Sequence, residues 1–416
     1  MEDQVPSKKK LEWPGLPNNI LLDIYVIAKR IGIKNIAIVG GAVRDELINN
    51  SQASSRNNPK DLDLVVEGSA TYLAKALVSQ LGPERVKDLH LHSAFETANM
   101  KIDCFPVDLA TARLEKYQAP GLNPEVTPCS LKEDLVRRDF SINAMAIELS
   151  SMRLLDPYFG KNALTKKEIE FLHPKSVEED PTRIIRAARY CSRLLFDLTP
   201  DALNQIQSTL SDWPWDLNSE EDNLHAPPAL ATRLRFELEL LFLQEPWKIA
   251  IANLQRWGGL LLLDKELQKD KYWKRRLIWA SRLKLNLLTA FLIGAEKPSS
   301  LAARLQLPKT QQILINQHLE IKEFLNALNE TKECLTWPPS KWANELEAKN
   351  WHPEAIALSI CDCGIWWRPL HRWWNQWRFI KSPISAKQLI KSGWIPGESL
   401  GRELKRLREK ELDKDI

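Results

Sequence analysis

Two carboxylates, Asp61 and Asp63, lie one residue apart in "NPKDLDLVVEG", a stretch otherwise rich in Leu and Val. Because side chains alternate between the two faces of a strand, both acids point the same way and the intervening Leu62 points the other way. Two like charges side by side repel each other unless something positive lies between them. From the pair alone, a solvated strand face is the simpler interpretation, so the neighbouring motifs must decide whether the pair does chemistry.

A strand that runs into Gly40 and Gly41 and then directly into a helix is predicted by "IVGGAVRDELI". Such a turn exposes backbone N–H groups and a helix N-terminus, which together bind anionic groups such as phosphates. Arg44, one turn into the helix, would add a fixed positive charge. The spacing is neither GxGxxG nor GxxxxGK[ST], which excludes the usual dinucleotide and P-loop motifs. Two glycines alone also fit an ordinary strand-to-helix turn.

Taken together, the glycine turn and the acidic pair predict a Mg²⁺ site that faces a polyphosphate. Mg²⁺ prefers carboxylate and phosphate oxygens and uses one or two protein carboxylates. Two such ions can activate an attacking hydroxyl and stabilise a leaving pyrophosphate. Asp108, in the later strand "FPVDLATAR", is either a third acid of this site or an ordinary Asp at a strand end.

Four polar residues, Arg137, Arg138, Asp139 and Asn143, precede an apolar run in "EDLVRRDFSINAMAIEL". Helix capping and a surface ion pair would explain Asp139 but not the paired arginines. In a functional interpretation, the Asp and Asn bind both hydroxyls of a sugar and an Arg neutralises phosphate.

A helix is predicted to begin near Pro181 in "VEEDPTRIIRAARY", since proline suits the first helical turn. Glu179, Asp180 and Arg183 would then fall on one side of it. Such acid–Arg pairs are usually plain helix ion pairs. As a recognition pair, the carboxylate would accept from the exocyclic amine of cytosine or adenine and the Arg would donate to the adjacent ring nitrogen. Uracil and guanine have the opposite pattern and would leave polar groups unpaired.

Five motifs now stand in order within residues 35–200, and this order resembles the class II tRNA nucleotidyltransferases, the family of bacterial-type CCA-adding enzymes and poly(A) polymerases. They are "VGGAVRD", "DLDLVVEG", "EDLVRRDFSINAMA", "LLDPYFG" and "EEDPTRIIRAARY". The resemblance implies an α+β fold, with a polymerase-β-like nucleotidyltransferase head of mixed β-sheet and helices followed by an elongated all-α body.

The resemblance also implies roles for matching positions. Asp61 and Asp63 would be the catalytic, metal-binding pair, with Asp108 as a further candidate, and Asp156 would lie between head and neck. The nucleotide-binding candidates are Gly40, Gly41, Arg44, Asp45, Arg137, Arg138, Asp139, Asn143, Glu179, Asp180, Arg183 and Arg186.

The activity implied by the family is template-independent addition of CMP, AMP or both, from CTP and ATP, to the 3′ end of tRNA, with two-metal-ion chemistry and release of pyrophosphate. Alternatives are an A-adding or CC-adding partial enzyme, a poly(A) polymerase, or a non-catalytic RNA-binding relative. Some members carry an HD phosphohydrolase domain, which is not expected here because the sequence has no His-Asp doublet.

Tryptophan marks a change of character along the chain, since 15 of the 16 Trp residues follow residue 200. Mixed α/β patterns precede residue 180 and helical patterns follow it. The predicted parts are an N-terminal helical lead (1–34), the head (35–155), a neck with the nucleobase-reading helix (156–200), a helical body (201–380) and a basic tail (381–416).

Composition sets further limits. The formal net charge is only +4, so affinity for nucleic acid must come from local patches. Six scattered cysteines indicate a reducing compartment. Without a secretory signal or an apolar run of about 18 residues, no membrane span is expected and a cytoplasmic location follows. The polar run "NNSQASSRNNP" predicts a flexible loop.

Residues 365–416 hold twelve Lys and Arg against six Asp and Glu, next to the aromatic run "IWWRPLHRWWNQWRF". Basic and aromatic residues together suit contacts with RNA. However, the tryptophans recur at helical spacing, which favours a packed core. Leu400, Leu404 and Leu407 likewise predict one packed face of a final helix.

Overall fold

The computed structural model describes residues 13, 16, 19–51, 59–212, 227–331, 336–362 and 364–415. Most of the predicted flexible loop, residues 52–58, lies outside these ranges. The chain forms two compact units, which are described separately. Unit 1 comprises Met1–Trp215, Ala226–Glu237 and Gln244–Gly259, and unit 2 comprises Asp216–His225, Leu238–Leu243 and Leu260–Ile416.

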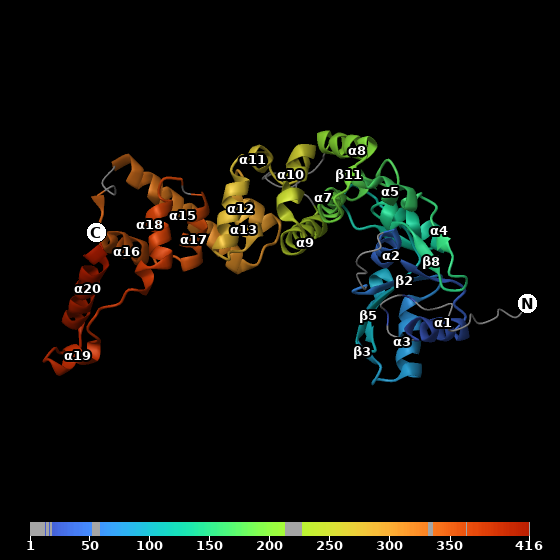
Figure 1. The fold of residues 1–416 in the computed structure, drawn as a ribbon, viewed down its shortest axis with the longest axis horizontal. Coiled ribbons are helices and arrows are strands. Elements are labelled where there is room, and N and C mark those ends of the chain that lie inside the picture. Colours follow the sequence, from blue (N-terminus) through green and yellow to red (C-terminus); the bar gives the residue numbers. More distant parts are fainter. Residues whose placement is uncertain are drawn as a thin grey trace, which may run out of the picture. The chain divides into compact units, whose positions relative to one another are not determined.

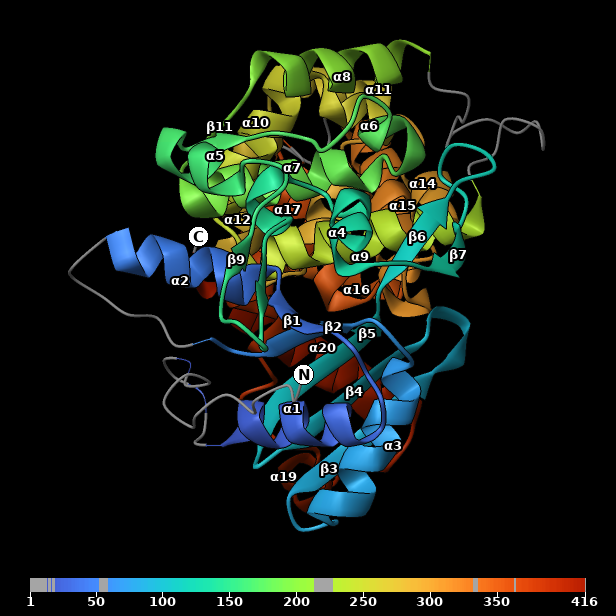
Figure 2. The ribbon, with the colours of Figure 1, turned by 90° about the vertical axis from the view of Figure 1, so that its right-hand side faces the viewer.

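A seven-stranded mixed sheet forms the centre of the head in unit 1 (Figures 1 and 2). Its order is β3-β4-β5-β2-β1-β8-β9, and only the β2–β5 pairing is parallel. The strands are β1 (Ile36–Val39), β2 (Leu62–Val66), β3 (Val86–His92), β4 (Thr97–Ile102), β5 (Phe105–Thr111), β8 (Ala146–Glu148) and β9 (Leu154–Leu155). The predicted head of mixed sheet and helices is confirmed.

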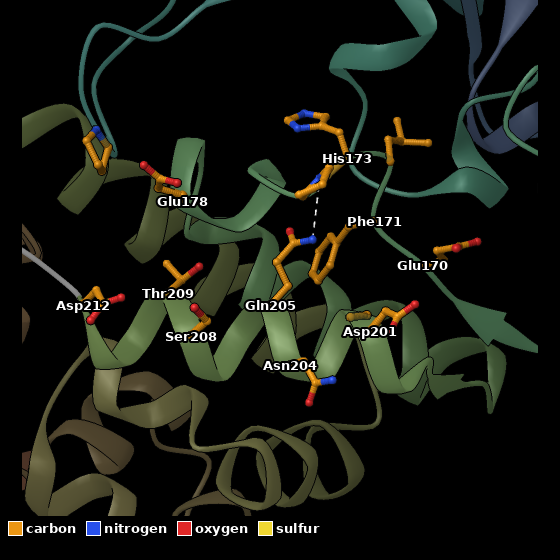
Figure 3. A pocket seen from close by; sticks show the side chains of 14 residues that line it. Glu170, Phe171, His173, Glu178, Asp201, Asn204, Gln205, Ser208, Thr209 and Asp212 are labelled. Atoms are coloured by element: carbon orange, nitrogen blue, oxygen red, sulfur yellow. Dashed lines mark hydrogen bonds between the residues drawn. The ribbon is translucent and has the colours of Figure 1, made fainter.

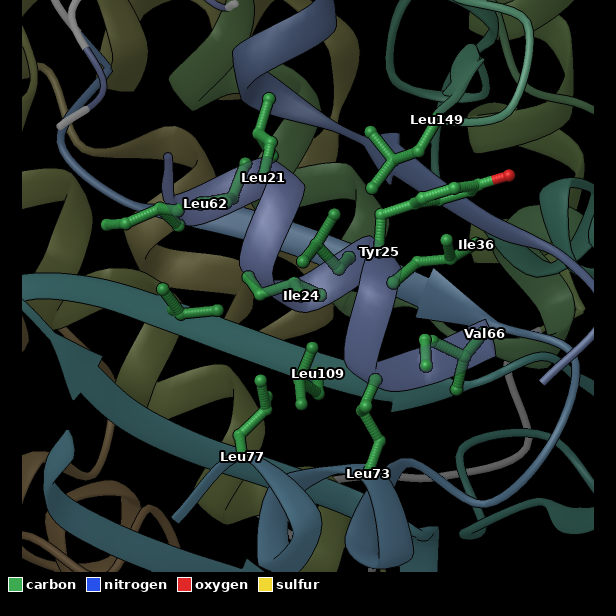
Figure 4. Packing of buried hydrophobic residues seen from close by; sticks show 14 of the residues in the cluster. Leu21, Ile24, Tyr25, Ile36, Leu62, Val66, Leu73, Leu77, Leu109 and Leu149 are labelled. Atoms are coloured by element: carbon green, nitrogen blue, oxygen red, sulfur yellow. The ribbon is translucent and has the colours of Figure 1, made fainter. Parts of the chain in front are cut away.

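Two amphipathic helices, α1 (Ile20–Arg30) and α3 (Ala70–Leu81), cover one face of this sheet. Figure 4 shows Ile24 of α1 and Leu73 of α3 pointing toward apolar side chains of the strands. Leu62 of β2 belongs to this core and is fully buried. Because neighbouring residues of a strand face opposite sides, the core contact of Leu62 directs Asp63 to the other face of the sheet.

Two small pairs of strands and further helices complete unit 1. The hairpin β6 (Arg113–Lys116) and β7 (Glu125–Pro128) lies in the sequence between β5 and β8, and the parallel pair β10 (Glu168–Ile169) and β11 (Asp197–Leu198) follows β9. Besides α1 and α3, the helices described in unit 1 are α2 (Gly41–Ser51), α4 (Leu131–Asp134), α5 (Gly160–Lys166), α6 (Ser176–Glu179), α7 (Thr182–Leu194), α8 (Pro200–Ser211), α9 (Pro228–Gln244, shared with unit 2) and α10 (Trp247–Trp257). Asp156 caps α5, because its carboxylate accepts from the backbone N–H groups of Gly160 and Lys161.

Unit 2 is helical in the part that the structure describes. Its helices are α11 (Lys265–Lys269), α12 (Trp273–Arg282), α13 (Leu287–Leu292), α14 (Pro298–Arg304), α15 (Lys309–Thr331), α16 (Pro339–Ala348), α17 (Pro353–Asp362), α18 (Trp367–Asn375), α19 (Ala386–Lys391) and α20 (Glu398–Leu412). None of the described helices is both long enough and apolar enough to cross a membrane.

The tryptophans of the aromatic run are core residues, as their helical spacing predicts. Trp366, Trp373 and Trp377 are buried in one cluster, and Trp367 and Trp374 pack against it. In the final helix α20, Leu400 is buried, while Leu404 and Leu407 are half-buried. The predicted packed face of this helix is therefore confirmed.

Candidate active site

The glycine turn brings two of the predicted motifs together. Gly40 follows β1 with a φ of +70°, a conformation that L side chains rarely adopt, and α2 begins at Gly41. A Cβ atom at Gly40 would lie 3.3 Å from Asp63 Oδ2 and 3.4 Å from Arg138 Nη1. The backbone conformation and the close approach both favour glycine, and the turn lies directly against an acid and an arginine of the site.

The strand pairing places the third candidate acid next to the second. Asp63 of β2 and Asp108 of β5 are direct partners in the parallel register. Burial, and then the charges of Asp61 and Asp108, raise the pKa of Asp63 to about 6, with Arg138 opposing them. Burial and the charge of Asp108 also raise the pKa of Asp61. Three carboxylates therefore repel one another at one place on the sheet.

The donor set at this place fits Mg²⁺ bound by two carboxylates. Asn99 Nδ2 donates to Asp108 Oδ1 at 2.6 Å, so one oxygen of Asp108 is already engaged. Within the described ranges, no three acidic, His or Cys side chains converge on one point where they would hold an ion. Asp61 and Asp63 would supply the protein ligands, because Mg²⁺ keeps several waters and takes its remaining oxygens from a substrate phosphate.

The raised pKa of Asp63 predicts how pH and Mg²⁺ affect stability. The pKa of Asp63 in the folded protein, about 6, exceeds the ordinary value of 3.8. The stability that protonated Asp63 contributes to the fold is therefore fully present below pH 3.8 and is lost as the pH rises through 6. Mg²⁺ should offset this loss, and we expect it to raise the Tm by about 2–4 °C at pH 7.5 and by much less at pH 5.

Calorimetry with Mg²⁺ and with EDTA checks this expectation. Asp63→Asn should raise the Tm of the metal-free protein at pH 7.5 and remove the Mg²⁺ effect. Glu84→Gln, at an exposed site before β3, should leave the effect of Mg²⁺ on the Tm unchanged. An equal Mg²⁺ effect at both pH values, or an unchanged one in Asp63→Asn, would contradict the assignment.

Asp139 lies at the centre of a buried hydrogen-bond network. Its Oδ1 accepts from Asn143 Nδ2 at 2.9 Å, and its Oδ2 accepts from Arg186 Nε and Nη2 at 2.9 and 2.7 Å. Arg44 Nη1 in turn donates to Asn143 Oδ1 at 2.8 Å. Burial would raise the pKa of Asp139, but Arg186 and Asn143 outweigh it and hold the pKa below its ordinary value. Asp139 is therefore a fixed, ionised acceptor.

The paired arginines have different surroundings. Arg137 is tied down by ion pairs to Asp134 at 2.8 Å and to Glu115 at 3.4 Å. Arg138 makes a longer contact, 3.5 Å, with Asp134, and its buried Nε has no hydrogen-bond partner among the described residues. Burial lowers the pKa of Arg138. A partly buried guanidinium whose Nε is an unsatisfied buried donor, beside the glycine turn, suits an anionic ligand such as phosphate.

Two cavities meet at Asp63. One, of about 300 Å³, is lined by Gly40, Gly41, Asp63, Glu115, Tyr117, Arg137, Arg138, Asp139, Asn143, Asp180, Arg183, Arg186 and Tyr190. The other, of about 270 Å³, shares Asp63, Arg137 and Arg138 with the first and runs along β2, β4 and β5 past Asn99 and Asp108. The first cavity holds most of the predicted nucleotide-binding residues. Among the predicted residues, Arg44, Asp45, Asp61 and Glu179 line neither cavity.

The predicted base-reading residues are not all on one helix. Arg183 belongs to α7, Asp180 is extended and Glu179 ends α6. Asp180 and Arg183 line the first cavity, whereas the Glu179 carboxylate lies 3.3 Å from His173 Nε2. Arg183 is buried and donates to the backbone carbonyls of Ser176 and Arg137. Its guanidinium is thereby fixed at the wall of the cavity.

Three residues that line the first cavity were not predicted, namely Glu115, Tyr117 and Tyr190. The Tyr117 hydroxyl donates to Glu115 Oε2 at 3.1 Å. The Tyr190 ring has the guanidinium groups of Arg44, Arg186 and Arg193 within 5.2–5.7 Å of its centre. Helical spacing could have indicated Tyr190, which lies four residues after Arg186 on α7.

A larger cavity of about 750 Å³ lies elsewhere in unit 1, beside α8 (Figure 3). Glu170, Glu178, Asp201 and Asp212 line it, and none of the described residues that line it is Lys or Arg. Gln205 Nε2 donates across it to the backbone carbonyl of His173 at 3.2 Å. An acidic wall of this kind does not suit a triphosphate, so size does not identify the active site here.

Comparisons with known proteins agree with this geometry. Residues 36–170 match the family model described as the poly A polymerase head domain. The chain is 46% identical over 165 residues to an A-adding tRNA nucleotidyltransferase of Aquifex aeolicus, covering 39% of this chain and 19% of that one. It is 39% identical over 235 residues to a CC-adding tRNA nucleotidyltransferase of Deinococcus radiodurans, covering 55% of each.

Solved structures are similar over nearly the whole chain. A tRNA-processing enzyme complex has a TM-score of 0.64 at 26% identity, over 94% of this chain and 100% of that one. The apo form II of a CCA-adding enzyme has a TM-score of 0.71 at 24% identity, over 98% of this chain and 95% of that one. This match shows a similar fold. Residues 36–170 are thus similar to the poly A polymerase head domain. The curated relatives that match this part of the chain are named as tRNA nucleotidyltransferases, which agrees with the resemblance of its motifs. The chain spans 19% and 55% of the length of these two relatives.

Proposed function

We propose that this protein transfers CMP, AMP or both from CTP and ATP to the 3′ end of tRNA, with release of pyrophosphate. The observation that carries the proposal is the position of Asp63 on the shared wall of two cavities, beside Asp61, Asp108 and the glycine turn. The names of the relatives support it, although the chain covers only 19% and 55% of the length of the two described above. A tRNA-processing enzyme solved with CTP has a similar fold at 25% identity.

In the proposed reaction, each cavity holds one substrate. The nucleotide lies in the first cavity, where Arg138 and the N–H groups at the glycine turn bind phosphate. Asp139 and Asn143 bind the ribose, and Asp180 and Arg183 read the base. The 3′-terminal hydroxyl of the RNA enters along the second cavity.

The hydroxyl oxygen attacks the α-phosphorus, a new P–O bond forms and the bond to the pyrophosphate oxygen breaks. Asp61 and Asp63 would hold Mg²⁺, which in a two-metal-ion reaction favours loss of the hydroxyl proton and neutralises charge on the leaving pyrophosphate. We place this activity in the cytoplasm, because the six cysteines are scattered along the sequence, which favours a reducing compartment.

A partial reaction, addition of the terminal A alone, is the second candidate. It is favoured by the 46% identity to an A-adding relative, although a CC-adding relative follows at 39%.

Incorporation assays separate these candidates. The substrates are tRNAs that end before CCA, after C and after CC, each with a single NTP and Mg²⁺. We expect CTP or ATP to be incorporated, and UTP and GTP to be excluded. Incorporation of ATP only, and only after CC, identifies an A-adding enzyme. No incorporation on any of the three tRNAs would refute the transferase proposal.

A further inference from the structure

A continuous series of buried and partly exposed ion pairs leads away from the ribose end of the site. Arg186 donates to Asp139 through Nε and Nη2, and its Nη1 donates to Glu237 Oε1 at 2.8 Å. The other oxygen of Glu237 accepts from Arg189 Nη1. Arg189 also pairs with Glu245 at 3.2 Å, and Glu245 pairs with Arg193.

The middle of this series lies in the protein interior, while Arg186 and Arg193 are 30% and 38% exposed. The side chains of Glu237 and Arg189 are 9% and 7% exposed, and that of Glu245 is fully buried. An ionised group in such surroundings is stable only when it is paired and hydrogen-bonded, so each member depends on its neighbours. Arg186, Arg189 and Arg193 recur at helical spacing on α7, and both glutamates come from chain beyond residue 236. Everything past Asp139 and Asn143 in the series lies outside the matched head domain, which ends at residue 170.

Arg186 is held by a carboxylate at each end. Two of its nitrogens fix one oxygen of Asp139, and the third nitrogen is fixed by Glu237. The second oxygen of Asp139 is fixed by Asn143, so the carboxylate has little freedom to rotate. An acceptor that selects a sugar hydroxyl needs such a fixed orientation, because a misplacement of about 1 Å can cost a hundredfold in rate.

We infer that Glu237 is a positioning residue for ribose selection, acting through Arg186 on Asp139. This inference rests on the proposed function, in which Asp139 binds the sugar of an NTP. Without the charge of Glu237, Arg186 loses its second anchor and can turn with Asp139, so the acceptor no longer matches the 2′- and 3′-hydroxyl groups. Glu237 lines neither of the two cavities that meet at Asp63, so it acts without contact with the nucleotide.

Glu237→Gln in the full chain tests the inference, with Glu245→Gln as the matched control. Each variant removes one buried carboxylate charge that pairs with Arg189, but only Glu237 contacts Arg186. Steady-state incorporation of CTP, ATP, dCTP and dATP into tRNA gives the ratio of kcat/KM for ribo- over deoxynucleotide. We expect this ratio to fall by about tenfold in Glu237→Gln, mainly through a higher KM for the NTP, and to stay near wild type in Glu245→Gln.

Thermal unfolding of both variants separates selection from stability. If Glu237 has a purely structural role, both Glu237→Gln and Glu245→Gln should have a lower Tm and a ribo- over deoxynucleotide ratio equal to that of wild type. That result would overturn the inference. An equal loss of selection in the two variants would overturn it as well. If Glu237→Gln does not fold, Glu237→Asp carries the test, because it keeps the charge but shortens the reach to Arg186 and should give an intermediate loss. A wild-type protein that neither binds nor incorporates CTP or ATP would overturn the proposed function, and the inference with it.

Discussion

Asp63→Ala should reduce nucleotide incorporation by about a thousandfold or more, while tRNA binding stays close to wild type. The carboxylate lies where the two cavities meet, and its pKa is raised to about 6 by burial and then by the charges of Asp61 and Asp108. A bound divalent cation would offset both effects. Alanine removes one of the two proposed protein ligands for Mg²⁺ but should leave the packed face of β2, which includes the buried Leu62, unchanged. Single-turnover incorporation with saturating tRNA and a separate tRNA-binding titration measure the two effects.

Asp61→Ala should reduce nucleotide incorporation by a similar factor. Glu84→Ala, at an exposed position before β3, should leave incorporation unchanged. Substantial turnover in both aspartate variants would remove the metal assignment. A parallel loss of tRNA binding would instead indicate that the acids support the fold of the head. Circular dichroism of each variant is therefore part of the experiment.

Local patterns predicted the acidic pair and the glycine turn because each is contained in a few residues. The alternation of Leu62 and Asp63 needs only a strand, and the turn at Gly40 needs only a strand that meets a helix. Five ordered motifs then limited the family. The tryptophans of α18 could be assigned to a core for the same reason, since their helical spacing is itself a packing pattern.

Residues brought together by distant strand pairing could not be predicted in the same way. Asp108 was ambiguous, because its place beside Asp63 depends on the parallel register of β2 and β5. Glu115 lies on a hairpin strand, and its side chain is 9% exposed and pairs with Arg137, which follows 22 residues later in the sequence. Both contacts, Asp63 with Asp108 and Glu115 with Arg137, join residues that are far apart in the sequence.

A break between two helices explains why Arg183 lines the first cavity and Glu179 does not. The sequence suggests one helical surface for both, but α6 ends at Glu179 and the chain is extended at Asp180. Pro181 then precedes α7, consistent with the restriction that proline places on the residue before it. The extended residue turns Glu179 toward His173 and leaves Asp180 at the cavity.

Arg183→Ala should lower the preference for CTP and ATP over UTP and GTP by about a hundredfold, and should weaken triphosphate binding less. Arg183 lines the cavity beside Asp180, and the carbonyls of Ser176 and Arg137 fix two of its nitrogens at 3.2 and 2.7 Å. Cytosine and adenine each offer an amine donor next to a ring acceptor, which matches a carboxylate next to a guanidinium. Uracil and guanine present the reverse pattern and are rejected only while both protein groups keep their positions.

The matched variants are Arg183→Lys and Arg256→Ala. Lysine keeps the charge but loses the planar set of donors, so it should restore triphosphate binding without base preference. Arg256, 61% exposed on α10, should have no effect on selection. The measurement is kcat/KM for each of the four NTPs, with Tm values recorded because alanine removes the side-chain donor to the backbone carbonyls of Ser176 and Arg137. Unchanged base preference in a folded Arg183→Ala protein would refute the role of Arg183 as a protein template, and selection would then have to come from Asp180 or from the RNA end itself.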